Sequence, residues 1–294
     1  MPLRIAWRYP GSGTGSTGGG ESRVRIGIVS PAKSLDPLAA ERTAAFAAIA
    51  YPAVDLVFHP QCFESDDGHF AGPDERRAAA FLEFANDAAF DAIWFGRGGY
   101  GSNRILTQAM PRLSAPARAK AYVGYSDMGF LLAALYARRI GRPAHGPMPI
   151  DVMRDGGDRT IARTLGWLTG DRQGLEPGLG GRPSVAFNLA ILDSLIGTPW
   201  LPDLADHVLL IEEVSEPLYR IDRMLFTMAN ATQLRGIAGV RLGAVTDVAE
   251  NDPPWGETLD TMLRRWCRDM GVPYLGRAEI GHTQGNCVVP FGVG

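Results

Sequence analysis

The sequence predicts an α/β protein, with a mostly parallel sheet in its N-terminal part and a second, smaller α/β domain after it. Two observations predict this class. From Val24 to about Met148, β-branched apolar segments alternate with helical segments, which is typical of parallel strands joined by crossover helices. A stretch rich in Gly, Asp and Arg over residues 151–183 then separates this series from a second one. We therefore expect a domain over 23–150, a linker or crossover over 151–183 and a second domain over 184–294.

The individual elements follow from apolar patterns and turn signals. In the first domain we expect strands at 24–30, 54–59, 92–95 and 121–124, and helices at 38–49, 74–86 and 127–139. The last of these helices is expected to end at Gly141, in the place of a C-cap glycine. In the second domain we expect helices at 188–196, 220–230 and 255–270, strands at 207–214 and 239–245, and a terminal apolar stretch at 288–290. Ligands of such sheets bind beyond the carboxyl ends of the strands, so we expect the functional residues in the loops at those ends.

The first 22 residues differ in composition from the rest. Residues 11–20 read GSGTGSTGGG, which is too rich in glycine and small polar residues to bury a surface, so we expect a flexible leader over residues 1–22. Residues 13–18 match the G-x-G-x-x-G dinucleotide fingerprint. That motif requires a strand before it and a helix after it, whereas a strand follows here, so we expect no dinucleotide cofactor.

Composition and charge narrow the possible partners. The 294 residues carry a formal charge of −3 without a block of like charges, which does not fit a nucleic-acid or membrane partner. The longest apolar run, Met128 to Ala137, is shorter than the ~18 residues of a membrane helix. Three scattered cysteines (Cys62, Cys267 and Cys287) without a CxxC pair predict neither a disulfide framework nor a zinc site. We expect a cytoplasmic protein with a small-molecule partner and no cofactor.

A serine stands where a predicted strand runs into a predicted helix. The segment Val123 to Asp127 reads VGYSD, which resembles a nucleophile elbow that presents the Ser126 hydroxyl above the sheet. It departs from strict G-x-S-x-G because Met128 holds the last glycine position. The alternative is that Ser126 or Asp127 only caps the helix.

A glycine-rich loop follows the strand at 92–95. It reads GRGGYG from Gly96 to Gly101, and glycines without a Cβ allow a substrate to approach the backbone N–H groups. Gly98 and Gly99 could supply part of an oxyanion hole. The alternative is an ordinary turn with Arg97 as a surface charge.

A carboxylate and a histidine complete a possible hydrolytic set. Glu212 lies at the end of an apolar strand, and His282 lies in a loop flanked by glycines. An imidazole can take a serine proton while a carboxylate fixes its tautomer. His145 is the only rival to His282, and the absence of an HExxH or a two-His-carboxylate spacing leaves a metal hydrolase unsupported.

Together these segments resemble the LD-carboxypeptidase family of serine peptidases, which includes muramoyltetrapeptide carboxypeptidase and the microcin C self-immunity peptidase. The resemblance covers Val24 to the C-terminus. Six motifs occur in the order and approximate spacing of the family: RGGYGSNRIL (97–106), VGYSD (123–127), HGPM (145–148), NLAILDSLIGTP (188–199), LLIEEVSEPLYRIDRML (209–225) and GH (281–282).

The resemblance implies Ser126 as nucleophile, Glu212 as the acid that orients the histidine and His282 as general base. The backbone N–H of Asp127, with one from Gly98 or Gly99, would form the oxyanion hole. It also implies a Rossmann-like N-terminal domain, a smaller C-terminal domain that carries Glu and His, an active site between the domains, and a homodimer. The implied reaction is hydrolysis of the L,D-peptide bond to the C-terminal D-alanine of murein tetrapeptides, in peptidoglycan recycling, through an acyl-enzyme.

The sequence specifies the residues that contact the substrate less closely than the catalytic residues. An exopeptidase must bind a free carboxylate, for which arginine is suited. The sequence does not choose among its candidates for substrate contact, which are Arg97, Tyr100, Arg104 and Arg220. Residues 186–189 read AFNL where relatives often have GGNL, which bears on substrate preference more than on the triad.

Two other functions stay open. A peptidase of the microcin C type would cleave peptidyl or aminoacyl adenylate analogues and would need an aromatic surface, for which Trp94, Trp200 and Trp255 are candidates. A non-catalytic protein that binds peptides or wall fragments could use the same fold, with Ser126 only as a helix cap.

Overall fold

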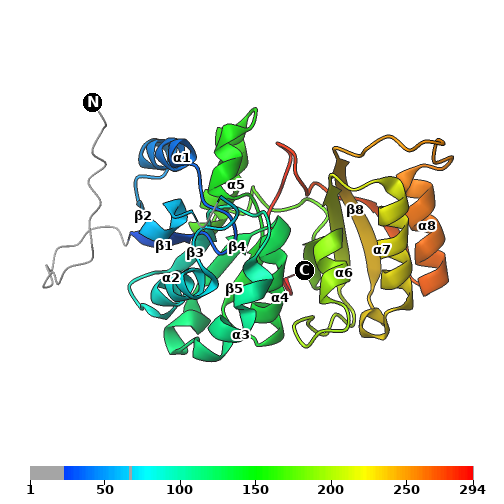
Figure 1. The fold of residues 1–294 in the computed structure, drawn as a ribbon, viewed down its shortest axis with the longest axis horizontal. Coiled ribbons are helices and arrows are strands. Elements are labelled where there is room, and N and C mark those ends of the chain that lie inside the picture. Colours follow the sequence, from blue (N-terminus) through cyan, green and yellow to red (C-terminus); the bar gives the residue numbers. More distant parts are fainter. Residues whose placement is uncertain (1–22, 66–67, 294) are drawn as a thin grey trace, which may run out of the picture.

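The computed structural model describes residues 23–65 and 68–293, which form two α/β lobes side by side (Figure 1). The expected leader over residues 1–22 and the fingerprint match at 13–18 lie outside the described residues. In the part of the chain that the structure describes, no helix is long and apolar enough to cross a membrane.

The first lobe is built on a six-stranded sheet in the order β10-β5-β4-β3-β1-β2. The first five strands are mutually parallel: β1 (Val24–Val29), β2 (Val54–Phe58), β3 (Ala92–Phe95), β4 (Ala121–Gly124) and β5 (Arg142–His145). The central strands are continuous apolar runs, as expected of a sheet that is covered on both faces.

Helices cover both faces of this sheet (Figure 1). On one face, α1 (Pro37–Ala50) and α5 (Gly157–Leu168) bury Ile28 and Trp94 of the sheet. On the other face, α2 (Asp74–Asn86), α3 (Leu106–Ala109) and α4 (Gly129–Ala137) bury Ile93 and Phe95. The candidate loops follow the carboxyl ends of β3 and β4, where Arg97, Gly99 and Ser126 are not fully buried.

The second lobe has a parallel sheet in the order β6-β7-β8-β9. Its strands are β6 (Ser184–Asn188), β7 (Val208–Val214), β8 (Gly239–Thr246) and β9 (Tyr274–Arg277). Its helices α6 (Leu189–Leu195), α7 (Leu218–Asn230) and α8 (Leu259–Met270) share one apolar core with α2 to α4 of the first lobe. The two lobes are thus packed directly against each other.

The C-terminal segment returns to the first lobe. After β9 the chain runs between the lobes, and β10 (Val289–Pro290) pairs antiparallel with β5, with Val289 opposite His145 (Figure 1). The backbone N–H of Glu176 also donates to the carbonyl of Val288 at 3.0 Å. This return fixes the loop that carries His282, because that loop lies just before β10.

The predicted α/β class with a mostly parallel sheet is confirmed, and most expected elements agree with the structure within a few residues. Five helices and strands were not predicted: α3, β5, α5, β6 and β9. Helix α5 lies in the stretch expected to be a linker or crossover. It forms because Ile161 and Leu165 fall on one face of an otherwise polar segment and pack on the sheet.

The expected end of the helix after Ser126 is wrong. A 3₁₀ turn over Ser126–Met128 precedes α4, which ends at Ala137. Arg139 takes the left-handed conformation (φ 54°), and the N–H of Ile140 closes the helix on the carbonyl of Leu135. Gly141 lies beyond this cap, where a Cβ would come within 2.5 Å of the carbonyl oxygen of Lys120.

Candidate active site

Ser126 occupies a strained turn at the carboxyl end of β4. Its φ is 59°, a conformation that a residue with a side chain adopts only when its surroundings enforce it. Gly124 permits the turn, because a Cβ there would lie 2.9 Å from the Phe95 ring and 3.1 Å from Met128. Neither Ser126 nor Asp127 caps the following helix with its side chain, so the helix-cap alternative finds no support. The turn has the form of a nucleophile elbow.

The glycine-rich loop runs directly alongside this turn. A Cβ at Gly98 would lie 3.1 Å from both the Cβ and the Oγ of Ser126, so the loop backbone faces the hydroxyl. Gly99 and Gly101 have φ values of 113° and 130°, which favour glycine. A Cβ at Gly99 would also come within 2.7 Å of Lys33, which shows that Lys33 lies against the outer side of the loop.

The carboxylate of Asp127 holds this loop to the turn. The backbone N–H groups of Gly101 and Ser102 donate to its two oxygens at 3.3 and 2.9 Å. The Ser102 hydroxyl in return donates to the backbone carbonyl of Asp127 at 2.6 Å. Burial raises the pKa of Asp127 to about 6, although the hydrogen bonds from Ser102 and Gly101 oppose this rise.

Glu212 and His282 are in direct contact. The His282 Nδ1 donates to Glu212 Oε2 at 2.8 Å, and the Glu212 side chain is fully buried. Glu212 lies where the pairing of β7 with β8 shifts register, and Gly243 and Gly281 make room for it. A Cβ at either glycine would lie within 3.2 Å of the Glu212 Cβ. The imidazole is therefore held in one tautomer with Nε2 free to accept a proton.

His145 supports the loop of His282. Its Nε2 donates to Asn286 Oδ1 at 2.9 Å, and the same oxygen accepts the N–H of Gly281 at 3.1 Å. Burial lowers the pKa of His145, which favours its neutral form. The residue thus ties the end of β5 to the histidine loop.

Tyr125 joins the serine turn to the histidine loop. Its ring centroid is 4.8 Å from that of His282, and its hydroxyl donates to Asp151 at 2.8 Å. Arg154 pairs with Asp151 at 3.0 Å and donates to the backbone carbonyl of His282 at 3.0 Å. The residue next to Ser126 thus packs on the imidazole. Within residues 23–65 and 68–293, the Ser126 hydroxyl has no hydrogen-bond partner.

Three arginines were candidates for the substrate carboxylate. Arg104 is paired with Asp74 at 2.9 Å, and Arg220 on α7 is paired with Glu216 at 2.7 Å. Arg97 makes a long contact of 3.5 Å to the carbonyl of Ser34. Among the three, Arg97 alone has no carboxylate partner in the described chain, so it is the one whose charge is available.

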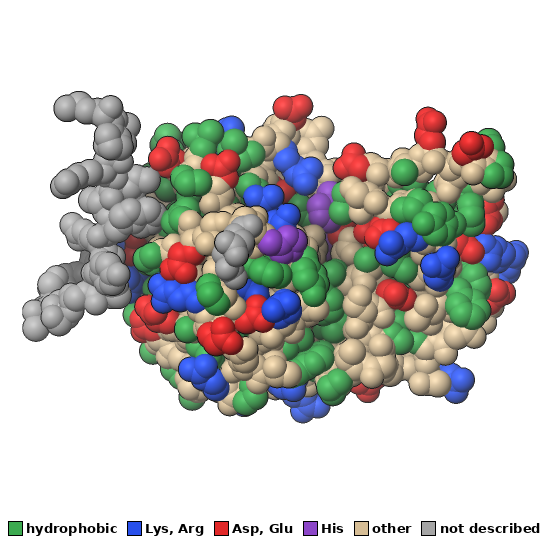
Figure 2. Space-filling view, in the orientation of Figure 1, with side chains coloured by type: hydrophobic (Ala, Val, Ile, Leu, Met, Phe, Trp, Pro, Cys, Tyr) green, Lys and Arg blue, Asp and Glu red, His purple; other side chains and the backbone are tan. Residues whose placement is uncertain are grey.

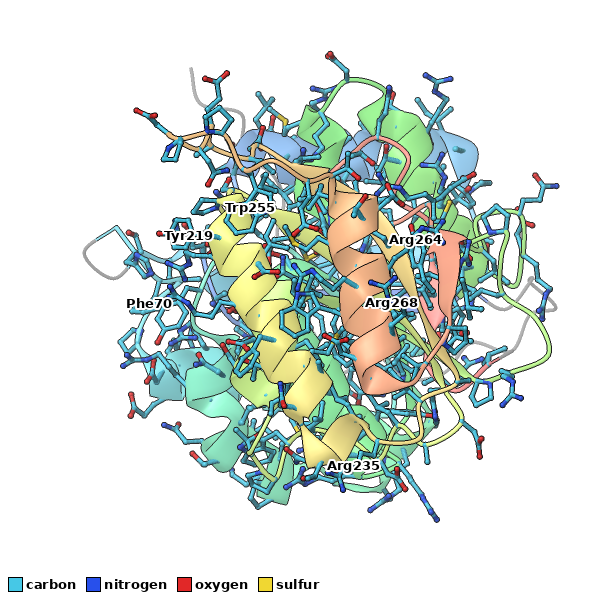
Figure 3. All side chains as sticks on the ribbon, turned by 90° about the vertical axis from the view of Figure 1, so that its right-hand side faces the viewer. Phe70, Tyr219, Arg235, Trp255, Arg264 and Arg268 are labelled. Carbon is cyan, nitrogen blue, oxygen red and sulfur yellow. The ribbon has the colours of Figure 1, made fainter. Side chains whose placement is uncertain are left out.

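The aromatic candidates are placed differently. Tyr100 is 47% exposed at the rim of the glycine loop, with its ring centroid 6.0 Å from that of Phe70. Trp94 is fully buried and donates its indole N–H to the carbonyl of Pro147, so it offers no surface to a ligand. Arg138 lies over the ring of Trp200 at 4.3 Å. Figure 3 shows Trp255 on the same side of the molecule as Phe70, toward the amino-terminal end of α7.

Other catalytic chemistries find little support in this region. Burial raises the pKa values of Cys62, Cys267 and Cys287 to about 12, 11 and 11, which disfavours thiolate nucleophiles. Among the residues that the structure describes, no group of three or more His, Cys, Asp or Glu side chains could hold a metal ion. Figure 2 shows histidine side chains at the surface near the middle of the molecule, with basic side chains beside them.

Several residues of this region carry no recognisable signal in the sequence. Asp151 and Arg154 fall in the stretch expected to be a linker, and Tyr125 stands in the sequence only as a neighbour of Ser126. Asn286 lies four residues after His282, and its contact with His145 could not be predicted from that position.

Comparison with known proteins adds independent findings. The LD-carboxypeptidase N-terminal domain matches residues 26–146, and the LD-carboxypeptidase C-terminal domain matches residues 183–294. A putative carboxypeptidase of Synechocystis sp. is 30% identical over 91% of this chain and 89% of that protein. A murein tetrapeptide carboxypeptidase of Pseudomonas aeruginosa is 27% identical over 76% of this chain and 78% of that protein.

Two solved structures have the same fold. A muramoyltetrapeptide carboxypeptidase from Oxalobacter formigenes superposes with a TM-score of 0.78 at 22% identity, over 92% of this chain and 93% of that one. MccF in complex with glutamyl sulfamoyl guanosine superposes with a TM-score of 0.77 at 18% identity, over 93% and 92%. These likenesses confirm the two-sheet α/β architecture.

Proposed function

The chain belongs to the LD-carboxypeptidase family and is a serine carboxypeptidase, and on this basis we propose that it hydrolyses the L,D-peptide bond to the C-terminal D-alanine of murein tetrapeptides. The observation that carries the proposal is the His282–Glu212 pair, which packs through Tyr125 against the strained turn of Ser126. These groups are of the types that activate a serine hydroxyl.

In the proposed reaction, the Ser126 Oγ attacks the carbonyl carbon of the third residue while its proton passes to His282 Nε2. Glu212 stabilises the imidazolium that forms, because its carboxylate already accepts the Nδ1 proton. The imidazolium then protonates the departing amine, and D-alanine leaves. Water, deprotonated by His282, hydrolyses the acyl-enzyme and restores the serine.

The oxyanion of the tetrahedral intermediate would lie between the turn and the glycine loop. The backbone N–H of Asp127 follows the nucleophile directly, and the N–H of Gly98 or Gly99 comes from the loop that faces Ser126. Each such donor is worth ~3 to 4 kcal/mol in the transition state. Arg97 is the first choice for the substrate carboxylate, because Arg104 and Arg220 are already paired.

The test is release of D-alanine from disaccharide tetrapeptide, measured by mass spectrometry. Wild-type protein should release it, whereas Ser126→Ala and His282→Ala should show no turnover while their circular dichroism spectra stay those of the wild type. Turnover by the Ser126 variant at the wild-type rate would refute the assignment of the nucleophile.

A second candidate reaction is cleavage of peptidyl or aminoacyl adenylate analogues. It is favoured by the likeness to MccF, which was solved with glutamyl sulfamoyl guanosine. This reaction needs a surface on which a base can stack, and the burial of Trp94 leaves Trp200, Trp255 or Tyr100 for it. Incubation with both substrate types decides between the two, because the preferred substrate has the higher kcat/KM.

The cellular context follows from the same proposal. We place the reaction in peptidoglycan recycling in the cytoplasm, and we expect a homodimer. Light scattering coupled to size-exclusion chromatography measures the mass directly, and a mass near 31.7 kDa would contradict the dimer.

A further inference from the structure

The position of the Asp127 side chain is not explained by helix formation. It caps neither the 3₁₀ turn nor α4, although it lies at their start. Only 1% of the residue is exposed, and its carboxylate points away from its own helix to the N–H groups of Gly101 and Ser102. A buried carboxylate therefore joins the start of the helix to a separate segment of backbone.

The contact is reciprocal, and this makes it rigid. The Ser102 hydroxyl, which is also buried, donates to the backbone carbonyl of Asp127 at 2.6 Å. The two segments are therefore joined by three hydrogen bonds, two to the carboxylate and one from the hydroxyl. Gly98, three residues before Gly101, lies against the Ser126 hydroxyl, so the bonds lie at the base of the loop that faces the nucleophile.

The other side of the Gly101 peptide is held by a cation. The guanidinium of Arg77 is fully buried and donates to the carbonyl of Gly101 at 2.8 Å and to that of Gly72 at 3.1 Å. Arg77 also pairs with Asp74, which is shared with Arg104. The charged groups that face this part of the loop are thus Asp127 from one element and Arg77, with its partner Asp74, from α2.

From these contacts we propose that Asp127 is a positioning residue for the hydrolysis, in that its carboxylate fixes the Gly98–Gly101 loop beside Ser126. The N–H groups of the loop are then in place before the tetrahedral intermediate forms, which is the condition under which such donors stabilise a transition state most. This inference rests on the proposed function for its kinetic consequence. The structural part, a carboxylate that restrains the loop, does not depend on the substrate.

The test is Asp127→Asn, which keeps the size of the side chain but replaces one acceptor oxygen by an NH₂ group facing a backbone N–H. The expected result is a fall in kcat of roughly 10- to 100-fold, with KM within about threefold, since oxyanion donors act on the transition state. Hydrogen exchange of the Gly101 and Ser102 amides should become at least about tenfold faster, because both lose a charged acceptor.

The matched control is Glu176→Gln. Glu176 is also a buried carboxylate that accepts backbone N–H groups, from Gly178 at 2.8 Å and Glu279 at 3.4 Å, but it lies away from the loop. It should lower stability while leaving exchange at Gly101 and Ser102 at wild-type values, because its carboxylate contacts neither residue. Unchanged exchange at Gly101 and Ser102 in Asp127→Asn, or a kcat within about threefold of the wild-type value, would overturn the proposal.

The outcomes separate the two proposals. If wild-type protein releases no D-alanine, the proposed function fails, whereas the exchange comparison still decides whether Asp127 restrains the loop. If Asp127→Asn does not fold, Ser102→Ala takes its place, because it removes the hydroxyl donor and keeps both amides. A threefold or larger loss of kcat with faster exchange at Gly101 then supports the proposal, and wild-type values of both overturn it.

Discussion

Replacing Asp127 by asparagine should change how the stability of this protein depends on pH. Burial raises the pKa of the carboxyl from 3.8 to about 6 in the folded state. The folded protein therefore binds a proton more tightly than the unfolded chain does. The contribution of this group to stability is fully present below about pH 4 and is lost as the pH rises through about 6. Asparagine does not titrate, so the variant lacks this dependence.

The size of the effect follows from the shift. A rise from 3.8 to about 6 is about 2 pKa units, which corresponds to about 3 kcal/mol of unfolding free energy in total. About 1 kcal/mol of this is already lost at pH 4.5, and nearly all of it is lost at pH 7.5. Between pH 4.5 and pH 7.5, the wild-type protein should therefore lose about 2 kcal/mol of unfolding free energy that the variant does not lose.

Urea unfolding of both proteins at four pH values between 4.5 and 7.5 measures this directly. The unfolding free energy of the wild type minus that of Asp127→Asn should fall by about 2 kcal/mol across the range, because other titrating groups cancel in the difference. A difference that stays constant within about 0.5 kcal/mol would refute the claim that this carboxyl is buried at a cost.

Three further predictions concern the site. Glu212→Gln should lower kcat by about 10³-fold or more at an unchanged melting temperature, since it disturbs the tautomer and charge that His282 needs; an equal kcat would argue against the pair. Gly98→Ala should lower kcat at least about tenfold, because its Cβ would meet the Ser126 hydroxyl at 3.1 Å. Gly180→Ala, where a Cβ meets nothing within 4 Å, is its control. Tyr125→Phe should lower the unfolding free energy by about 1 to 2 kcal/mol in urea titrations, through loss of the bond to Asp151, and wild-type stability would contradict this.

The sequence was most informative where apolar patterns are strong. The strand at 92–95, the helix at 74–86 and the long apolar run after Ser126 could be identified because each is long or uniformly apolar. The contact of Glu212 with His282 was predicted from the residue types and the family resemblance, and the two side chains indeed meet at 2.8 Å. The catalytic roles of Ser126, Glu212 and His282 stay predictions until the variants are measured.

The features that could not be predicted from the sequence depend on contacts between distant segments. Helix α5 was expected to be part of a linker because the stretch is rich in Gly, Asp and Arg. The apolar residues Ile161 and Leu165, four positions apart, nevertheless form a helix that packs on the sheet. Gly141 was expected as a helix cap, but Arg139 takes the left-handed position because the chain must turn two residues earlier to enter β5. Strand β10 is only two residues long, so its own pattern does not define it. It is a strand because Val289 pairs with His145 of β5, which lies 144 positions earlier in the chain.

The groups gathered at this site share a physical property, which is that each costs stability in the resting state. Ser126 is held at a φ of 59°, the Asp127 carboxyl is buried, and Glu212 Oε1 is buried without a partner among the described side chains. The burial of Glu212 favours the reaction. Its negative charge is only partly balanced while the His282 imidazole is neutral, and it is balanced when that imidazole takes up the serine proton. Removing such a group should therefore stabilise the fold or leave it unchanged while it lowers kcat, whereas removal of an ordinary core contact lowers stability first.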